Sequence, residues 1–386
     1  MSNVKFGRLS PAATAVLCLA LAGCAATASH QPAAENEIVI GVAGPMSGSI
    51  SKFGQEERRG VALAVDDINA AGGLLGKQIR LEAGDDQCDP KKAVIIANDM
   101  VSLKASLVVG HFCSGSSNAA AATYISNNIV QITPASTDPH LTNRGPSQSW
   151  KTLFRVINPN DRQSSFVADW IIRKYPQGRI AVLDDGDMYY GGAIANELAG
   201  QLQHASHKPI VRRSFQPRSG HYDDLIGLLK SNNIDLVYIG AFEDGFAHIV
   251  REARAEGVTA IFIGPDALNN SEFASMAGAA ADGVRFVDSV VPFGTPEADK
   301  IGARLQSNDR DPESYALPSY AAVQAWAEGV KRAGTTDGVK VAAAMRSAPI
   351  DTVIGKLSWD KKGDIEQMRY AWFVWHGGSY AQEHSN

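Results

Sequence analysis

The sequence predicts an α/β protein with two lobes, each built on a parallel sheet. Short apolar segments alternate with amphipathic segments of helical periodicity along almost the whole chain. Fully apolar strands between helices are typical of a parallel sheet covered on both faces. The alternation restarts after FRVINPND, residues 154–161. Two consecutive series of strands and helices therefore predict two sheets of similar size, with a cleft where the carboxyl ends of their strands face each other.

The individual elements follow from apolar periodicity and from helix stop signals. In the first series we expect strand 38–42, helix 55–71 ending at two glycines, strand 79–83, helix 91–101, strand 107–109, helix 117–126 and strand 130–133. In the second series we expect helix 163–174, strand 180–183, helix 192–204, strand 210–215, helix 222–230, strand 236–239, helix 245–256 and strands 261–263 and 284–287.

The N-terminus has the pattern of a secretory signal, residues 1–23, with Lys5 and Arg8 before a short apolar core. Leu-Ala-Gly before Cys24 resembles a bacterial lipobox, which predicts that Cys24 is lipidated and becomes the first mature residue. Ala-Thr-Ala at 26–28 leaves ordinary cleavage open as an alternative. Residues 24–37 would then form a flexible tether. No later run of about 18 apolar residues predicts a membrane span.

The number of cysteines and the net charge indicate whether the chain has a disulfide, a metal site or a nucleic-acid partner. If the signal and Cys24 are set aside, Cys88 and Cys113 remain, which in an exported chain suggests a disulfide, with two buried free thiols as the alternative. Two cysteines without histidines at ligand spacing are too few for a metal site. DDQCD lacks the spacing of a calcium loop, and Asp89 before Pro90 is instead expected to start the following helix. We expect no metal and no cofactor. The net charge of −5 and the absence of a basic stripe argue against nucleic acid as a partner.

Two turns that follow strands are candidate anion sites. GHFCSGSSNAA begins at residue 110 and TPASTDPHLT covers residues 133–142; both carry small residues and hydroxyls, and the first precedes a helix whose N–H groups favour an anion. Ser114 has no nucleophile-elbow motif around it, so catalysis is not expected. Its alternative role is that of a helix cap, which Ser116 or Ser117 could also fill.

Eight segments, taken in order, resemble one known family. They are GPMSG (44–48), DDINAAGGLLG (66–76), DDQCDPKKAV (85–94), GHFCSGSS (110–117), ITPASTDPHLT (132–142), NIDLVYIGAF (233–242), GPDA (264–267) and LSWDKKGD (357–364). Together they resemble the leucine/isoleucine/valine-binding proteins of branched-chain amino acid ABC transporters, which are class I periplasmic binding proteins. The resemblance covers nearly the whole chain after the expected signal.

The resemblance implies two Rossmann-like lobes joined by a three-strand hinge, the Venus-flytrap arrangement. We expect crossovers near Asn158, Asp288 and Trp359. These boundaries would give lobe 1 residues 38–158 and 289–359, and lobe 2 residues 159–288 and 360–386. The resemblance also implies a disulfide between Cys88 and Cys113, in agreement with the cysteine count.

The resemblance further implies the ligand contacts. Ser114 and Thr137 would hold a ligand carboxylate with backbone groups of Ala135 and Ser136, and Asp266 would meet the ammonium. An amino acid presents both charges, and charge-assisted hydrogen bonds to each are short and strong. Thr137 could instead be a turn hydroxyl, and Asp266 could cap a helix starting at Asn269.

Aromatic residues would form the remaining wall of the site. Phe53 and Phe242 fall where the family often has tyrosine, with core packing as the alternative for each. Either Tyr189 or Tyr190 would supply a hydroxyl. Asp266 is one methylene shorter than the glutamate often found in branched-chain binders, so it must approach the ligand closely or act through water.

These expectations describe a binding protein and not an enzyme. It would capture an amino acid, with a branched-chain or other aliphatic side chain expected, and deliver it to an inner-membrane ABC permease and its ATPase. Alternatives are a sensing module for a membrane receptor and a binder of another small acid or amide. We expect a monomer in the periplasm or cell envelope, attached to a membrane through its N-terminal lipid.

Overall fold

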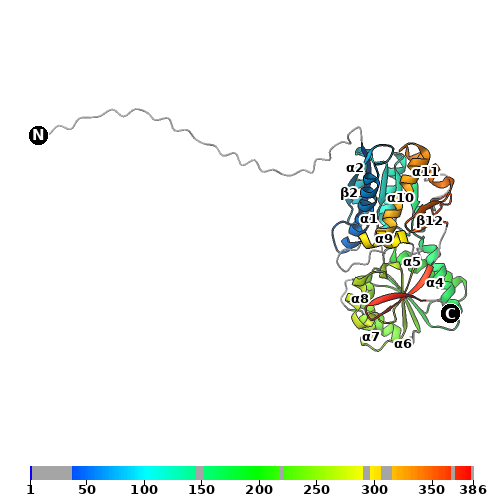
Figure 1. Cartoon of the computed structure of the whole chain (residues 1–386). Helices are drawn as coiled ribbons and strands as arrows, with labels where there is room; N and C mark the ends of the chain where they lie inside the picture. The colour runs from blue at the N-terminus through cyan, green and yellow to red at the C-terminus, as the bar shows by residue number, and fades with distance from the viewer. Residues whose placement is uncertain are drawn as a thin grey trace. The chain divides into compact units, whose positions relative to one another are not determined.

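The computed structural model describes residues 1, 37–143, 151–217, 221–289, 296–305, 315–366 and 370–383. The chain divides into two compact units, residues 1–32 and 33–386. All of the described helices and strands belong to the second unit (Figure 1). Apart from Met1, the expected signal lies outside the described residues, as do Cys24 and the tether as far as residue 36.

Five parallel strands form the first sheet, in the order β2-β1-β3-β4-β5. Their bounds are β1 (Glu37–Gly44), β2 (Gln78–Asp85), β3 (Leu107–Gly110), β4 (Val130–Thr133) and β5 (Leu153–Arg155). Every residue of β3, β4 and β5 is buried. Strand β3 lies inside the sheet and is covered on both faces, which explains its apolar sequence.

Helices cover both faces of the first sheet, and we call this sheet with its helices lobe 1. Ile40 and Val42 of β1 pack with α1, α9, α10 and α11, whereas Val39 and Ala43 pack with α2 and α3. This division follows from the alternation of side chains along a strand. The bounds are α1 (Ser51–Ala70), α2 (Pro90–Ser102), α3 (Ser114–Ser126), α9 (Pro296–Leu305), α10 (Ala316–Ala333) and α11 (Gly338–Ser347).

Seven strands form the second sheet, in the order β14-β13-β10-β9-β8-β6-β7. Those from β6 to β10 pair in parallel, whereas β13 pairs antiparallel with both β10 and β14. The bounds are β6 (Ile180–Asp184), β7 (Val211–Ser214), β8 (Leu236–Gly240), β9 (Ile261–Gly264), β10 (Arg285–Ser289), β13 (Tyr370–His376) and β14 (Ser379–Glu383).

The second sheet is also covered on both faces, and we call it with its helices lobe 2. One apolar cluster joins it to α4 and α5, and another joins it to α6, α7 and α8. The bounds are α4 (Asn160–Lys174), α5 (Gly191–His204), α6 (Asp223–Ser231), α7 (Glu243–Ala255) and α8 (Ser271–Ala277). Short elements complete the described chain, namely the antiparallel pair β11 (Ile350–Thr352) and β12 (Gly355–Leu357), and 3₁₀ turns η1 (Pro139–Leu141), η2 (Asp266–Leu268) and η3 (Gly278–Ala281).

The two-lobed α/β prediction is confirmed, but some bounds and some elements differ from the expectation. Helix α1 begins at Ser51 and not at residue 55, and α8 to α11, β5 and β11 to β14 were not among the individually expected elements. The helix expected from residue 117 begins at Ser114, because the small residues after Cys113 already form its first turn. The sheets have five and seven strands, since the C-terminal hairpin β13–β14 extends the second sheet. Asp89 caps α2 by accepting a hydrogen bond from the Lys91 N–H at 2.7 Å, and this also agrees with the sequence.

The predicted disulfide is present between Cys88 and Cys113, whose Cα atoms are 5.4 Å apart. It joins the segment after β2 to the turn after β3. Within the described ranges, no helix has both the length and the apolar composition needed to span a bilayer. The described His, Cys, Asp and Glu side chains also include no group of three placed to hold a metal ion.

Candidate functional site

Ser114 lies at the carboxyl end of the first sheet, as the first residue of α3. Its side chain is buried, and Oγ accepts hydrogen bonds from the backbone N–H groups of Thr137 (3.2 Å) and Asp138 (3.3 Å). A hydroxyl that accepts these bonds still has its proton to donate. The first N–H groups of α3 have no acceptor within the helix. This turn can therefore offer several donors to an anion.

The alternative roles of Ser114 find no support in its contacts. Cys113 is the N-cap residue of α3, and no side chain caps that helix. His111 is not available as a base, because its ring nitrogens contact Asp86 Oδ2 (2.5 Å) and Tyr124 hydroxyl (3.0 Å). All three of these side chains are buried.

The loop after β4 is held in place by its own threonine and by a buried arginine. Thr133 Oγ1 accepts from the backbone N–H groups of Ala135 (3.3 Å) and Ser136 (2.9 Å). The Ser136 hydroxyl contacts that of Ser117 at 2.7 Å. Thr137 Oγ1 is buried and has no hydrogen-bond partner in the described chain. Of these four loop residues, Thr137 is the one whose side chain has an unused donor.

The side chain of Arg155 in β5 holds the loop that follows β4. Its fully buried guanidinium donates to the carbonyls of Ser136 (3.0 Å) and Asp138 (3.1 Å) and forms an ion pair with Asp364 (2.7 Å). Burial acts to raise the pKa of Asp364, but the Arg155 charge and the hydrogen bond from Thr142 outweigh it and lower that pKa. The ion pair connects the loop to the C-terminal part of the chain.

Asp266 lies at the carboxyl end of the second sheet, in the turn after β9. Its Oδ1 accepts from Gln163 Nε2 (3.1 Å) and from the Tyr190 hydroxyl (3.0 Å), and its Oδ2 lies 3.5 Å from the Tyr315 hydroxyl. Asp266 does not cap α8, because that role belongs to Asn270. Three neutral donors thus surround the carboxylate.

The charge of Asp266 is not balanced by a cation in the described chain, where its side chain forms no ion pair. Its side chain is only 5% exposed. Burial raises the pKa of Asp266 above its usual 3.8, while the hydrogen bonds from Gln163, Tyr190 and Tyr315 act in the opposite direction. A buried carboxylate of this kind is stabilised when a cation approaches it.

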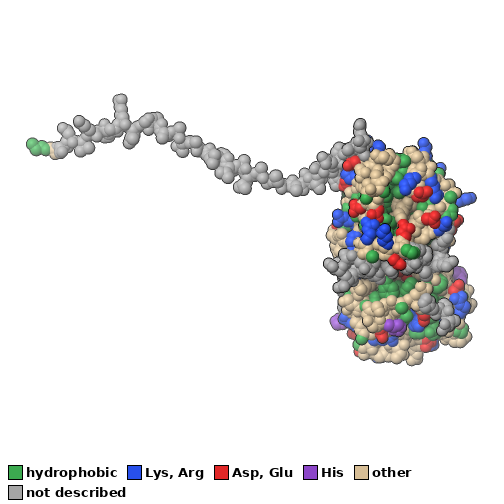
Figure 2. All heavy atoms as spheres, viewed as in Figure 1, with side chains coloured by type: hydrophobic (Ala, Val, Ile, Leu, Met, Phe, Trp, Pro, Cys, Tyr) green, Lys and Arg blue, Asp and Glu red, His purple; other side chains and the backbone are tan. Residues whose placement is uncertain are grey.

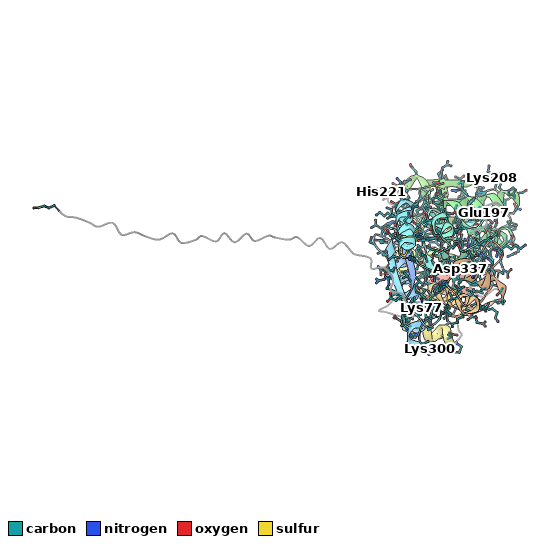
Figure 3. All side chains as sticks on the ribbon, turned by 90° about the horizontal axis from the view of Figure 1, so that it is seen from above. Lys77, Glu197, Lys208, His221, Lys300 and Asp337 are labelled. Carbon is teal, nitrogen blue, oxygen red and sulfur yellow. A yellow bond between two sulfur atoms is a disulfide. The ribbon has the colours of Figure 1, made fainter. Side chains whose placement is uncertain are left out.

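A cavity of about 440 Å³ lies between these two sheet ends. This volume falls within the usual range of about 300–1,000 Å³ for small-molecule sites. Its lining comes from both lobes: Ile50, Cys88, Pro90, Phe112, Cys113, Ser114, Gly115, Ala135 and Tyr315 on one side, and Asp187, Met188, Tyr189, Tyr190 and Phe242 on the other. The charged residues labelled in Figure 3, such as Lys77 and Glu197, do not line it.

The predicted aromatic residues divide between the wall and the layer behind it. Both Tyr189 and Tyr190 line the cavity, as does Phe242. Phe53 is buried in α1, where its ring stacks on Phe112 at 5.0 Å between centroids. Since Phe112 lines the cavity, Phe53 supports the wall from behind.

The predicted polar residues differ in whether they line the cavity between the lobes. Ser114 and Ala135 line the cavity, while Ser136, Thr137 and Asp266 do not. Asp266 is linked to the cavity through Tyr190, which lines the cavity and donates a hydrogen bond to the Asp266 carboxylate.

The sequence reasoning missed Gln163 and Tyr315. Gln163 follows the start of α4 and reaches a carboxylate about a hundred residues later in the chain. Tyr315 precedes α10 and contacts both the aromatic wall and Asp266. No local motif marks either residue, so only their position in the folded chain identifies them.

Surface charge also bears on the kind of site. On the face shown in Figure 2, Lys and Arg side chains lie interspersed with Asp and Glu side chains. The described residues of this face form no continuous basic stripe of the kind that binds nucleic acid. The fold and the cavity together define a two-lobed protein that binds a small molecule between its lobes.

Comparison with known proteins gives the family. Residues 37–376 match the periplasmic binding protein family, and the chain belongs to it. A Pseudomonas aeruginosa relative named amino acid binding protein is 35% identical over 375 residues, covering 95% of this chain and 97% of the relative. The Leu/Ile/Val-binding protein of Escherichia coli is 33% identical over 368 residues, covering 94% and 97%.

Solved structures show the same fold. A leucine-binding protein of Thermotoga maritima superimposes with a TM-score of 0.81 at 23% identity, over 90% of this chain and 98% of that protein. A branched-chain amino acid transporter substrate-binding protein of Streptococcus pneumoniae, solved with isoleucine, gives 0.79 at 23% identity, over 90% and 99%. Membership of a family of binding proteins agrees with the prediction that this chain is not an enzyme.

Proposed function

We propose that this chain is the solute-binding protein of an ABC importer and that it captures an amino acid between its lobes. The observation that carries the proposal is Asp266, a buried carboxylate without a cation partner in the described chain, opposite the donor-rich turn at Ser114. An α-amino acid has an anion and a cation a few atoms apart and can satisfy both groups.

In this proposal the ligand carboxylate binds to lobe 1. The Ser114 and Thr137 hydroxyls donate to it, with N–H groups of the α3 N-terminus and the backbone of Ala135 and Ser136 close by. The unused donor of Thr137 and the free proton of Ser114 support these roles. The dipole of α3 adds to the stabilisation of an anion.

The ligand ammonium binds next to Asp266, through one tyrosine hydroxyl from each lobe. Tyr190 and Tyr315 line the cavity, and both hydroxyls lie within 3.5 Å of Asp266. When these hydroxyls donate to Asp266, their oxygens can accept from the ammonium. The short side chain of Asp266 then acts one hydrogen bond away from the ligand instead of in direct contact.

The third group of the ligand is an aliphatic side chain. The cavity wall includes the rings of Phe112, Phe242 and Tyr189, together with both cysteines of the disulfide. Such a surface favours an apolar group by burying it. Relatives named for leucine, isoleucine and valine support the same class.

We further propose a hinge at the three predicted crossovers, near Asn158, Asp288 and Trp359. Lobe 1 would comprise residues 38–158 and 289–359, and lobe 2 residues 159–288 and 360–386. The strands on either side support these boundaries, because β5 belongs to the first sheet while β6, β10 and β13 belong to the second. A ligand that contacts both lobes favours their closure, and the closed monomer would then dock on the permease with its ATPase.

The location follows from the N-terminal pattern. We propose a periplasmic protein held at a membrane by lipid on Cys24, with residues 25–37 as the tether. Replacement of Cys24 by alanine would release the protein into the soluble fraction. Ordinary cleavage after Ala28 would instead leave fractionation unchanged in this variant.

The test is a thermal-shift screen of the purified protein against amino acids, amides and small carboxylic acids. A ligand that binds only the folded state raises the melting midpoint. We expect a rise with leucine, isoleucine or valine that is lost in Ser114→Ala and Asp266→Ala. A rise with acids that lack an ammonium, but not with amino acids, would contradict the proposed ligand class.

A further inference from the structure

One lysine of lobe 1 contacts three acceptors of lobe 2. Lys52 lies in the first turn of α1, and its Nζ is 2.6 Å from Glu243 Oε1, 2.8 Å from Glu272 Oε2 and 3.0 Å from Asn270 Oδ1. Glu243 is the first residue of α7, Asn270 caps α8, and Glu272 lies in the first turn of α8. An ammonium has three donors, so lobe 2 supplies an acceptor for each.

The Lys52–Glu243 contact is shielded from water. Their side chains are 10% and 5% exposed, whereas Glu272 is 53% exposed. Burial raises the pKa of Glu243, although the Lys52 charge opposes this rise. Lys52 of lobe 1 pairs with one oxygen of the Glu243 carboxylate, and the other oxygen has no hydrogen-bond partner in the described chain.

The contact lies beside the cavity. The Lys52 ammonium is 4.6 Å from the centroid of the Phe53 ring, and Phe53 stacks on the wall residue Phe112. On the other lobe, Glu243 directly follows the wall residue Phe242. Separation of the lobes at the cavity must therefore also separate Lys52 from Glu243.

We propose that Lys52 and Glu243 form an ionic latch that holds the two lobes in the closed arrangement, in addition to any contact with the ligand. When both residues are present, closure pairs their charges. When Lys52 is removed, closure buries the Glu243 carboxylate without a cation, which is strongly unfavourable. When Glu243 is removed, Lys52 keeps only the exposed Glu272 as a charged partner, so the cost is smaller. Lys52 is thus a positioning residue that controls how long a bound ligand stays, although it does not touch that ligand.

Glu272 and Asn270 have a lesser role. Since Glu272 is half exposed, its attraction for Lys52 is screened by water and contributes little. Asn270 Oδ1 also accepts the backbone N–H of Phe273 as the cap of α8 at 3.1 Å. Both orient the ammonium toward Glu243, and the buried pair should dominate any measured effect.

The test compares Lys52→Met with wild type by stopped-flow release of leucine. Methionine keeps the apolar stem and removes the charge. We expect the dissociation rate to rise by about tenfold or more, since loss of one partner of a buried charge pair acts on dissociation. Adding Glu243→Gln to Lys52→Met should slow release again, because no buried charge is then left unpaired. Lys52→Arg should retain most of the wild-type rate.

A matched control is Lys230→Met. Lys230 pairs with Glu256 at 3.2 Å within lobe 2, and both are exposed, so release should change by less than about twofold. A Lys52→Met rate within twofold of wild type would overturn the latch. If Lys52→Met fails to fold, Glu243→Gln is compared with wild type instead. We expect its leucine dissociation rate to rise by about threefold or more. An unchanged dissociation rate in Glu243→Gln would also overturn the latch.

A second measurement needs no ligand and separates this proposal from the proposed function on which the leucine assay rests. Small-angle scattering of the ligand-free protein should give a larger radius of gyration for Lys52→Met than for wild type. If leucine does not bind wild type but this difference is found, the ligand class is wrong and the latch stands. If leucine binds and the two ligand-free proteins scatter alike, the latch does not act without ligand and the proposal is overturned.

Discussion

Two buried carboxylates, Glu57 in lobe 1 and Asp266 in lobe 2, both have a raised pKa. They differ in their hydrogen-bond partners and in their connection to the cavity. Glu57 of α1 is fully buried, packs against Gly44 of β1, and has no hydrogen-bond partner in the described chain. Burial and the negative charge of Asp86 raise its pKa. Asp266 is surrounded by three neutral donors, two of them on cavity-lining tyrosines. Burial alone therefore does not single out a ligand group, and the proposed role of Asp266 rests on its hydrogen bonds to cavity-lining tyrosines.

The largest effect should come from Asp266→Asn, which keeps the shape and removes the charge. We expect leucine affinity to fall by more than about a hundredfold, or about 3 kcal/mol, because the buried ammonium loses its counter-charge. Isothermal titration of leucine and of its α-hydroxy acid analogue measures this. The analogue lacks the ammonium and should be affected far less.

A matched control for this variant is Asp169→Asn, which removes an exposed carboxylate of lobe 2. It should leave leucine affinity unchanged. An equal loss of both ligands in Asp266→Asn would show that Asp266 maintains the shape of the cavity and does not recognise the ammonium.

The lobe 1 donors should have the next largest effect. Ser114→Ala and Thr137→Val should each weaken leucine binding by about 2 kcal/mol, or roughly thirtyfold, since each removes a hydrogen bond to a charged group. The α-hydroxy acid analogue should lose affinity to the same extent, because it keeps the carboxylate. A loss confined to leucine would contradict the assignment of these hydroxyls to the carboxylate.

Glu57→Gln should act in the opposite direction, on stability and not on binding. The raised pKa means that the stability contribution of Glu57 is complete below its ordinary value of 4.5 and is lost as the pH rises. Glutamine does not ionise, so Glu57→Gln should not lose stability as the pH rises. Its free energy of unfolding should exceed that of wild type by about 1–2 kcal/mol at neutral pH, and the difference should disappear toward about pH 4. Thermal melting across this pH range tests the prediction, and leucine affinity should stay constant.

The smallest effect separates two adjacent tyrosines. Tyr190→Phe removes a donor to Asp266 and should weaken leucine binding by about 1 kcal/mol, or roughly fivefold. Tyr189→Phe should change it by less than about twofold, because the Tyr189 ring, which packs beside Gly115, is retained. Equal effects of the two substitutions would remove the proposed role of the Tyr190 hydroxyl.

The sequence predicted the parts of this molecule that depend on local chemistry. The apolar strands, the turn at Ser114 and the cap at Asp89 are determined by residues adjacent in the chain. The cysteine count and the family resemblance together predicted the disulfide, which is confirmed. Phe53 was expected in the cavity wall and lies behind it, because α1 directs its ring toward Phe112.

The parts that the sequence did not predict depend on contacts between distant segments. Gln163 and Tyr315 reach Asp266 from opposite directions along the chain, and Lys52 of α1 contacts residues of α7 and α8 in the other lobe. Hydrophobic periodicity and turn motifs carry information over a few residues. Such long-range pairs become visible only in three dimensions.

The disulfide contributes directly to the cavity wall, since Cys88 and Cys113 both line it. The covalent bond joins two segments that would otherwise have to be ordered each time a ligand arrives, and that ordering costs free energy. A chain with reduced thiols would keep its sequence but would meet this cost at every binding event. We therefore expect reduction of the disulfide to weaken ligand binding even where the fold is retained.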